Sequence, residues 1–216
     1  MLNAFKSEHG TTMCTLALKE VSKYYLRNRS KVFVGMIDAS KAFDRLSNEK
    51  LYNILIDRNI PAVVILILFD SCRRQRLQTG WNGCFSEQFG ILNGVKQGGI
   101  ASPVLFTIYM DVLLQRLEVC GSGCRLGNNY FGGLSYADDL AILSPTVKGL
   151  QKMLNECKLF SEELGVRYNP TKSVAMHITR SRSTPPDVYI AGQVTKWVDV
   201  TKHLGNYISC DLKEAD

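Results

Sequence analysis

The sequence predicts an α+β fold in which helices pack on one face of an antiparallel sheet, and three observations lead to this prediction. The chain has 216 residues, 45% hydrophobic and 21% charged, which is typical of a globular domain and unlike a disordered chain. Some segments repeat apolar residues at helical spacing and others are short β-forming runs. Their order is compatible with a β-α-β-β-α-β core of the ferredoxin-like kind.

The first part of the chain predicts helices around one strand. Residues 11–28 carry apolar side chains every three or four positions, as one face of a helix does. Residues 31–38 are rich in Val, Phe and Ile and predict a strand that ends in a carboxylate. Helices are expected over about 48–58 and 61–70, because proline is tolerated in a first helical turn.

The middle of the chain predicts two hairpins separated by a helix. Asn82 and Gly83 have the preferences of a type I′ turn. Ser102 and Pro103 form a good N-cap and first turn for an apolar helix that runs to about Leu117. Short strands over about 130–136 and 140–143 then flank a tip that carries two adjacent acids.

The last part predicts another helix followed by short strands. Apolar residues between Leu150 and Leu164 lie on one helical face, and Gly165 can end that helix in a left-handed conformation. Strands are expected over 172–178, around Gly192, and over 203–208.

Charge and composition restrict the classes of partner. The 26 Lys and Arg residues against 20 Asp and Glu give a net charge of +6, which mildly favours a polyanion. Seven scattered cysteines are unlike a disulfide framework and favour a reducing compartment. The most apolar run, residues 60–69, is about half the length of a membrane span, so no membrane partner is expected.

Three acids stand out because they border β-forming runs: Asp38, and the pair Asp138 and Asp139. If their strands are neighbours, like charges share a small volume, which is costly unless a cation lies between them. Oxygen ligands without nearby His favour Mg²⁺ or Mn²⁺ over zinc. The alternative for each acid alone is a turn cap or a solvated side chain.

Several segments occur in the order of reverse-transcriptase motifs: residues 33–44, 93–106, 136–139, 165–172 and 203–205. On these residues the sequence resembles a non-LTR (LINE-type) retrotransposon reverse transcriptase, from about Phe5 to about Ile208.

Within this set, residues 38–44 (DASKAFD) resemble the first palm motif and residues 94–103 (GVKQGGIASP) the second. Residues 136–139 (YADD) resemble the polymerase signature hairpin.

The resemblance implies a polymerase palm with partial fingers, as a fragment of a reverse transcriptase domain that covers residues 1–216. Fingers are expected at about 1–30 and 61–100, and palm at about 31–60 and 101–180. Residues 181–216 would form a region with a primer-grip-like hairpin. Amino-terminal fingers motifs and a thumb are not expected within this sequence.

The resemblance also implies catalytic residues. Asp38 and Asp138 would bind two Mg²⁺ ions, with Mn²⁺ as an alternative, and Asp139 would assist. Lys172 resembles a lysine that protonates the departing pyrophosphate, although the default for lysine is a solvated surface.

Nucleotide contacts are implied for Ala39, Phe43, Gln97 and Gly98. The Phe43 ring would collide with a 2′-hydroxyl, which favours deoxynucleotides, and its alternative is a core aromatic side chain. Glycine at position 98 would allow a close backbone approach to the nascent base pair.

Contacts to the nucleic acid strands are implied at two further places. Leu204 and Gly205 resemble a primer grip, although an ordinary hairpin would have the same sequence. Arg73, Arg74 and Arg76 would contact backbone phosphates, and a solvated face is their alternative.

The expected function is therefore RNA-directed DNA polymerisation, in which dNTP, an RNA template and a DNA primer are the partners. The alternative is a catalytically inactive, retrotransposon-derived remnant that binds nucleic acid. An RNA-copying RNA polymerase is disfavoured by Phe43. Neither the oligomeric state nor the cellular location is indicated by the sequence.

Overall fold

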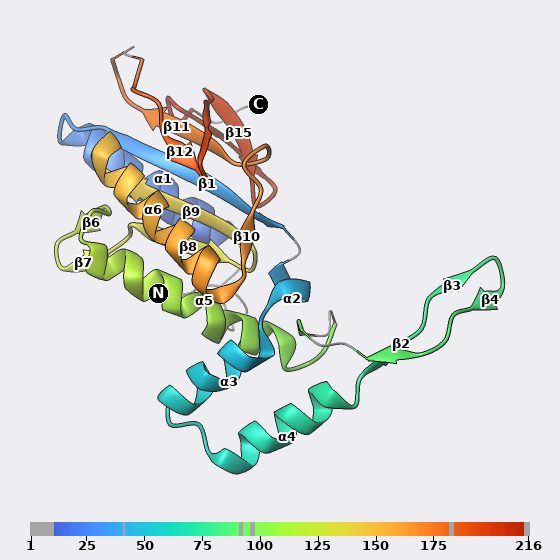
Figure 1. The fold of residues 1–216 in the computed structure, drawn as a ribbon. Coiled ribbons are helices and arrows are strands. Elements are labelled where there is room, and N and C mark those ends of the chain that lie inside the picture. The colour runs from blue at the N-terminus through green and yellow to red at the C-terminus, as the bar shows by residue number, and fades with distance from the viewer. Residues whose placement is uncertain (1–10, 41, 91–92, 96–97, 182–183, 214–216) are drawn as a thin grey trace.

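The computed structural model describes residues 11–40, 42–90, 93–95, 98–181 and 184–213 (Figure 1). It contains one mixed sheet with helices on both faces, and a helix and a long hairpin arm that extend away from this body.

The sheet is organised around its longest strand, β1 (Val32–Ser40). Strand order is β14-β11-β1-β9-β8, and β10 pairs with the far end of β1. Every pairing in it is antiparallel except β11 with β14. The other strands are β8 (Gly133–Tyr136), β9 (Asp139–Ser144), β10 (Arg167–Tyr168), β11 (Val174–Ile178) and β14 (Lys196–Trp197).

The predicted β-α-β-β-α-β core is confirmed. Helix α5 (Ser102–Cys120) follows β1, the hairpin β8–β9 comes next, and α6 (Val147–Leu164) leads on to β11. Both helices pack on the same face of the sheet (Figure 1).

The expectation that helices cover only one face needs a correction. Helix α1 (Thr11–Arg27) packs on the opposite face, where Leu18 and Val21 contact the sheet. The physical reason lies in β1, whose side chains are apolar on both sides: Phe33 and Ile37 face α5 and α6, whereas Val34 faces α1. A strand that is apolar on both faces has to be covered on both.

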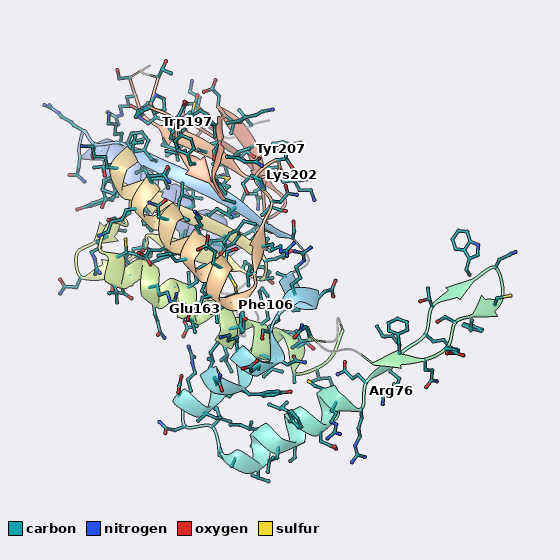
Figure 2. All side chains as sticks on the ribbon, viewed as in Figure 1. Arg76, Phe106, Glu163, Trp197, Lys202 and Tyr207 are labelled. Carbon is teal, nitrogen blue, oxygen red and sulfur yellow. The ribbon has the colours of Figure 1, made fainter. Side chains whose placement is uncertain are left out.

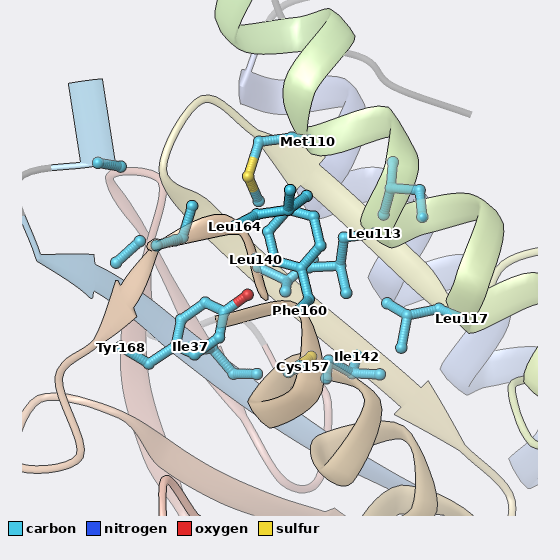
Figure 3. Close-up of a cluster of buried hydrophobic side chains, with 14 of the residues drawn as sticks. Ile37, Met110, Leu113, Leu117, Leu140, Ile142, Cys157, Phe160, Leu164 and Tyr168 are labelled. Carbon is cyan, nitrogen blue, oxygen red and sulfur yellow. The ribbon is translucent and has the colours of Figure 1, made fainter. Parts of the chain in front are cut away.

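The larger part of the core lies between the sheet and helices α5 and α6, and Figure 3 shows its centre. Its large side chains are fully or almost fully buried, so they fix the distance between helices and sheet. Those labelled in the figure are Ile37, Met110, Leu113, Leu117, Leu140, Ile142, Cys157, Phe160, Leu164 and Tyr168.

The helix ends are largely as predicted. Thr146 Oγ1 accepts a hydrogen bond from Gly149 N–H at the start of α6, and Gly165 ends that helix with a φ of 80°. Pro103 lies in the first turn of α5, as expected. The prediction that Ser102 is its N-cap is wrong, because Ala101 occupies that position and Ser102 is already helical and buried.

Two short helices follow β1, namely α2 (Ala42–Arg45) and α3 (Asn48–Asp57). Helix α4 (Ala62–Arg73) comes next and has no buried residue. The arm beyond it consists of β2 (Arg76–Leu77), β3 (Gly80–Trp81), β4 (Cys84–Phe85) and β5 (Phe89–Gly90). Asn82 and Gly83 have positive φ angles at its tip, as the predicted type I′ turn requires.

Three smaller hairpins complete the fold. They are β6 (Arg125–Leu126) with β7 (Asn129–Tyr130), β12 (Tyr189–Ile190) with β13 (Gln193–Val194), and β15 (Val200–His203) with β16 (Asn206–Ser209). No helix in the described part of the chain combines the length and hydrophobicity needed to cross a membrane.

Helix α2 is held by the segment that precedes α5. Gly94 N–H donates to the Leu46 carbonyl at 2.7 Å, and Val95 N–H donates to the Phe43 carbonyl at 2.9 Å. Gly94 has a φ of 92°, and a Cβ there would lie 2.8 Å from the Asp44 carbonyl oxygen and 2.9 Å from that of Phe43. Only glycine therefore fits this contact between the two segments.

We predict that Gly94→Ala lowers the free energy of unfolding by about 3 kcal/mol, from backbone strain and steric overlap combined. Gly83→Ala is the matched control, because Gly83 has a φ of 80° but no atom within 4 Å of an added Cβ. The control should cost only about 1 kcal/mol. Urea unfolding of both variants measures the difference, and equal losses would contradict the close contact at Gly94.

A second prediction concerns acid stability. Burial lowers the pKa of His203 from 6.5 to about 4, so the folded chain binds this proton less readily than the unfolded chain. The stabilisation from neutral His203 is complete above about pH 6.5 and is lost as the pH falls towards 4. Between pH 7 and pH 4, His203→Leu should lose about 3 kcal/mol less stability than the natural chain, as measured by urea unfolding. Equal losses of stability in His203→Leu and the natural chain would show that His203 is accessible to protons in the folded chain.

Candidate active site

The three acids singled out in the sequence lie together at one end of the sheet. Strands β1 and β9 pair from Phe33 opposite Ser144 to Asp38 opposite Asp139. In the hairpin β8–β9, Tyr136 pairs with Asp139, so Ala137 and Asp138 form the turn. Asp138 therefore lies beside the end of β1, as the sequence predicted from neighbouring strands.

The turn is made without glycine, although Ala137 has a φ of 54°. This left-handed conformation costs an alanine roughly 1 kcal/mol. The Ser135 hydroxyl donates to the Ala137 carbonyl at 3.4 Å and supports the turn locally. The short hairpin thus places Asp138 at its tip and Asp139 at the first position of β9.

Electrostatics confirm that the acids are close enough to interact. Burial is the largest cause that raises the pKa of Asp139 above its ordinary value, and the charges of Asp138 and Asp38 raise that pKa further. The ionised form of Asp139 is therefore less stable than that of an isolated, solvated aspartate.

Beside the acids lies a pocket of about 430 Å³. Its lining comes from three parts of the chain: the end of β1 with α2, the tip of the β8–β9 hairpin, and the loop before β11. The lining residues are Asp38, Ala39, Ser40, Arg45, Asp138 and Lys172. The fold thus brings Asp38, Ala39, Asp138 and Lys172 together as the sequence analysis expected.

The backbone of Asp38 is fastened to the loop that carries Lys172. Asp38 N–H donates to Ser173 Oγ at 3.1 Å, and Asn169 N–H donates to the Asp38 carbonyl at 2.8 Å. Ser173 Oγ also donates to the Asn169 carbonyl at 2.7 Å. The loop therefore fills the interval in which β1 changes its partner from β11 to β10.

The same loop is ordered by one asparagine side chain. Asn169 Oδ1 accepts from Thr171 N–H at 3.1 Å, from Thr171 Oγ1 at 2.6 Å and from Lys172 N–H at 3.4 Å. Such an Asx turn restricts the backbone at Lys172. Lys172 is thereby held at the rim of the pocket that Asp38 lines.

The donor set fits a hard divalent cation. Carboxylate oxygens are the ligands that Mg²⁺ and Mn²⁺ prefer, and a cation would offset the burial and the neighbouring charges of Asp138 and Asp38 that raise the pKa of Asp139. Within the described residues, no group of three or more His, Cys, Asp or Glu side chains is arranged as a metal site by itself. Ligands from a substrate or water would have to complete the coordination.

Phe43 lies on α2, next to the pocket in sequence but outside its lining. Its ring stacks on Phe106 of α5, with a centroid distance of 4.3 Å and an interplanar angle of 17°. The side chain is half-buried, so it is packed against the core and still has an accessible part.

Other expected nucleotide and primer contacts lie in turns. Gln97 is outside the described residues, and Gly98 is exposed with a φ of 79°. Leu204 and Gly205 have φ angles of 50° and 82° in the turn between β15 and β16. Neither Gly98 nor this turn contributes to the lining of the acidic pocket.

The three arginines lie where α4 joins the arm, and Figure 2 shows Arg76 at this junction. Arg74 Nε pairs with Asp70 Oδ1 at 2.9 Å. Arg76 Nη1 donates to the carbonyls of Arg73 and Gln75, both at 3.2 Å, near the end of α4. Arg74 and Arg76 therefore have local partners, although all three residues are solvent-exposed enough to meet a phosphate.

Sequence reasoning did not single out Ser40 and Arg45, which also line the pocket. Ser40 lies within the first palm motif and Arg45 directly follows it, so the motif itself was the available signal. Asn169 and Ser173 were also missed, because their contacts to Asp38 join segments more than 130 positions apart.

Comparison with known proteins identifies the family. The family model described as "Reverse transcriptase (RNA-dependent DNA polymerase)" matches residues 3–208. The Pol polyprotein of the type-2 retrotransposable element R2DM of Drosophila melanogaster is 30% identical over 167 residues, which cover 77% of this chain and 15% of that protein. The RNA-directed DNA polymerase from mobile element jockey of the same organism is 22% identical, with 97% of this chain and 23% of that protein covered.

Solved structures give the same fold. Apo telomerase from Candida tropicalis, truncated from its C-terminal domain, has a TM-score of 0.65 at 16% identity, covering 99% of this chain and 41% of that one. Telomerase from the same organism in complex with a fragment of telomeric RNA has a TM-score of 0.67 at 12% identity, covering 98% and 33%. The polymerase palm expected from the sequence is therefore confirmed.

The chain spans less than a quarter of the length of the R2DM and jockey relatives. The matched part nevertheless includes every segment that lines the acidic pocket. Because the family model covers nearly the whole sequence and the relatives come from a retrotransposable element and a mobile element, the chain belongs to the reverse transcriptase (RNA-dependent DNA polymerase) family, as its resemblance to non-LTR retrotransposon reverse transcriptases predicted.

Proposed function

We propose that this chain is the RNA-directed DNA polymerase domain of a non-LTR retrotransposon. It would add deoxynucleotides from dNTP to the 3′-hydroxyl of a DNA primer on an RNA template. The observation that carries this proposal is the pocket in which Asp38 and Asp138, from two separate palm motifs, meet Lys172.

Asp38 and Asp138 would hold two divalent ions, Mg²⁺ or Mn²⁺, with assistance from Asp139. When bound, these ions supply activation of the primer hydroxyl and stabilisation of charge on the leaving phosphate. The raised pKa of Asp139 supports this role, because a nearby cation would favour its ionised form. The two carboxylates would orient the reacting groups, since β1, which ends near Asp38, and the β8–β9 hairpin, whose turn carries Asp138, are both anchored in the core.

Two residues would act on the phosphates of the nucleotide. The backbone of Ala39, which lines the pocket, would support the nucleotide beside Asp38. Lys172 would donate a proton to the departing pyrophosphate as a general acid. The Asx turn at Asn169 would hold Lys172 in place for this transfer.

Phe43 would select the sugar. Its ring stacks on Phe106, and its backbone is held by the hydrogen bond that Val95 N–H donates to the Phe43 carbonyl. A rigid ring at this place would clash with a 2′-hydroxyl and admit a 2′-deoxyribose.

The template and primer would contact more peripheral residues. Gln97 and Gly98 would lie against the nascent base pair, and the turn at Leu204 and Gly205 would support the primer end. Arg73, Arg74 and Arg76 would meet backbone phosphates in a salt-dependent manner.

The principal test is primer extension on an RNA template with Mg²⁺. Asp138→Ala should lower the extension rate by about 100-fold or more, because transition-state charge would lose its stabilisation. Asp57→Ala is the matched control, since Asp57 is an exposed acid at the end of α3. Equal activity of Asp138→Ala and the natural chain would refute the assignment.

The thermal unfolding of Asp138→Ala separates catalysis from folding. Removal of one of three repelling carboxylates should leave the midpoint unchanged or raise it. Nucleic acid binding by the natural chain without any divalent-dependent extension would favour the inactive remnant instead.

A second test concerns sugar selection. Phe43→Val should lower the ratio of kcat/KM for dCTP to that for CTP by about tenfold or more, because the smaller side chain no longer excludes the hydroxyl. Phe43→Tyr keeps the ring and should keep the discrimination. Steady-state single-nucleotide extension measures both ratios, and an unchanged ratio in Phe43→Val would show that Phe43 serves only to pack against Phe106.

A further inference from the structure

Arg45 is a cation in the acidic pocket that has no acidic partner in the described part of the chain. Four described arginines do have such a partner, among them Arg58, which lies 2.6 Å from Asp111, and Arg116, which lies 2.7 Å from Glu163. Arg45 makes no such ion pair with a described carboxylate, although it lines the same pocket as Asp38 and Asp138. Because a guanidinium stays protonated at neutral pH, its charge is available to an anion that enters the pocket.

The backbone that carries Arg45 is fixed on both sides. On one side, the Phe43 carbonyl accepts from Val95 and the Phe43 ring stacks on Phe106. On the other, the Leu46 carbonyl accepts from Gly94, and the Leu46 side chain is fully buried. Arg45 thus extends from an ordered base, so less conformational freedom is lost when it binds a ligand.

We infer that Arg45 binds the β- and γ-phosphates of the incoming nucleotide, and afterwards the pyrophosphate product. This inference rests on the proposed polymerase function and assigns a residue to the outer phosphates. Asp38 and Asp138 would take the metal ions and the reacting α-phosphate, which leaves Arg45 and Lys172 as the basic lining residues for the outer phosphates.

The side chains of Arg45 and Lys172 differ in chemistry, and this difference assigns them different roles. The planar fork of Arg45 matches two phosphate oxygens at once but does not give up its proton. Lys172 is a point charge that can act as an acid. The volume of the pocket, about 430 Å³, is within the range of ligand sites. Arg45 and Lys172 can therefore contact the same triphosphate group in it.

The inference predicts a phosphate-specific loss of binding in Arg45→Gln. Isothermal titration with Mg²⁺ present, and without primer or template, compares dTTP, pyrophosphate and dTMP as ligands. Affinity for dTTP and pyrophosphate should fall by about 10- to 100-fold, as expected for the loss of one or two charge-assisted hydrogen bonds. Affinity for dTMP, which lacks the outer phosphates, should change by less than about twofold.

Arg167→Gln is the matched control. Arg167 is exposed on β10 opposite Ser40, close to the pocket but outside its lining. A similar loss in both variants would overturn the inference, because general electrostatic attraction would then explain the binding. Arg45→Lys should recover part of the affinity, since it restores the charge without the fork.

Kinetics provide an independent readout. In single-nucleotide extension, Arg45→Gln should raise KM for dTTP by about tenfold, with kcat changed by less than about threefold, as loss of uniform substrate binding does. If the natural chain extends primers and Arg45→Gln leaves the pyrophosphate affinity unchanged, this inference is overturned and the proposed function stands. Pyrophosphate affinity that depends on Arg45 in a chain without any extension would instead contradict the proposed function.

Discussion

The pairing of β1 with β9 is the constraint on which the rest of the site depends. It brings together Asp38 and Asp139, whose charges repel, and it places Asp138 beside them. Nothing in the acids favours this arrangement. The favourable free energy comes from the apolar part of the same strands, where Ile37, Leu140 and Ile142 are buried under α5 and α6. Hydrophobic burial thus holds the three acids together although their charges repel.

The rest of the pocket lining depends on segments that are far apart in sequence. Helix α2 has only four residues and could not persist alone. Its position relies on the Gly94 contact and on the Phe106 side chain of α5. The Lys172 loop likewise relies on the backbone of Asp38. The acidic residues and the basic residues Arg45 and Lys172 are therefore positioned by separate contacts, all of them near the end of β1.

Much of this fold is predictable from the sequence because local patterns determine it. Periodicity located the helices, turn preferences located the hairpin tip at Asn82 and Gly83, and ordered motifs located the palm. Which face of the sheet α1 covers was not predicted, because helical periodicity defines an apolar face but not its partner. The continuous apolar run of β1 carries that information, since both of its faces need cover.

The site residues that were missed have a different physical origin. Arg45 is conspicuous only once folding leaves it without a carboxylate in the described part of the chain. Ser173 matters because its hydroxyl accepts the hydrogen bond from Asp38 N–H that a neighbouring strand would otherwise accept. This contact joins segments that are distant in sequence. No periodicity or motif spacing encodes such contacts.

Helix α4 has an apolar sequence but is not buried. Val63, Leu66 and Ile67 are each more than 60% exposed. Because α4 places only Ile65 and Leu68 against the core, the geometry of the acids does not depend on its outer face. The part of the chain that sets the chemistry is therefore the part that buries its own apolar surface, whereas the arm and α4 extend from it without fixing the acids.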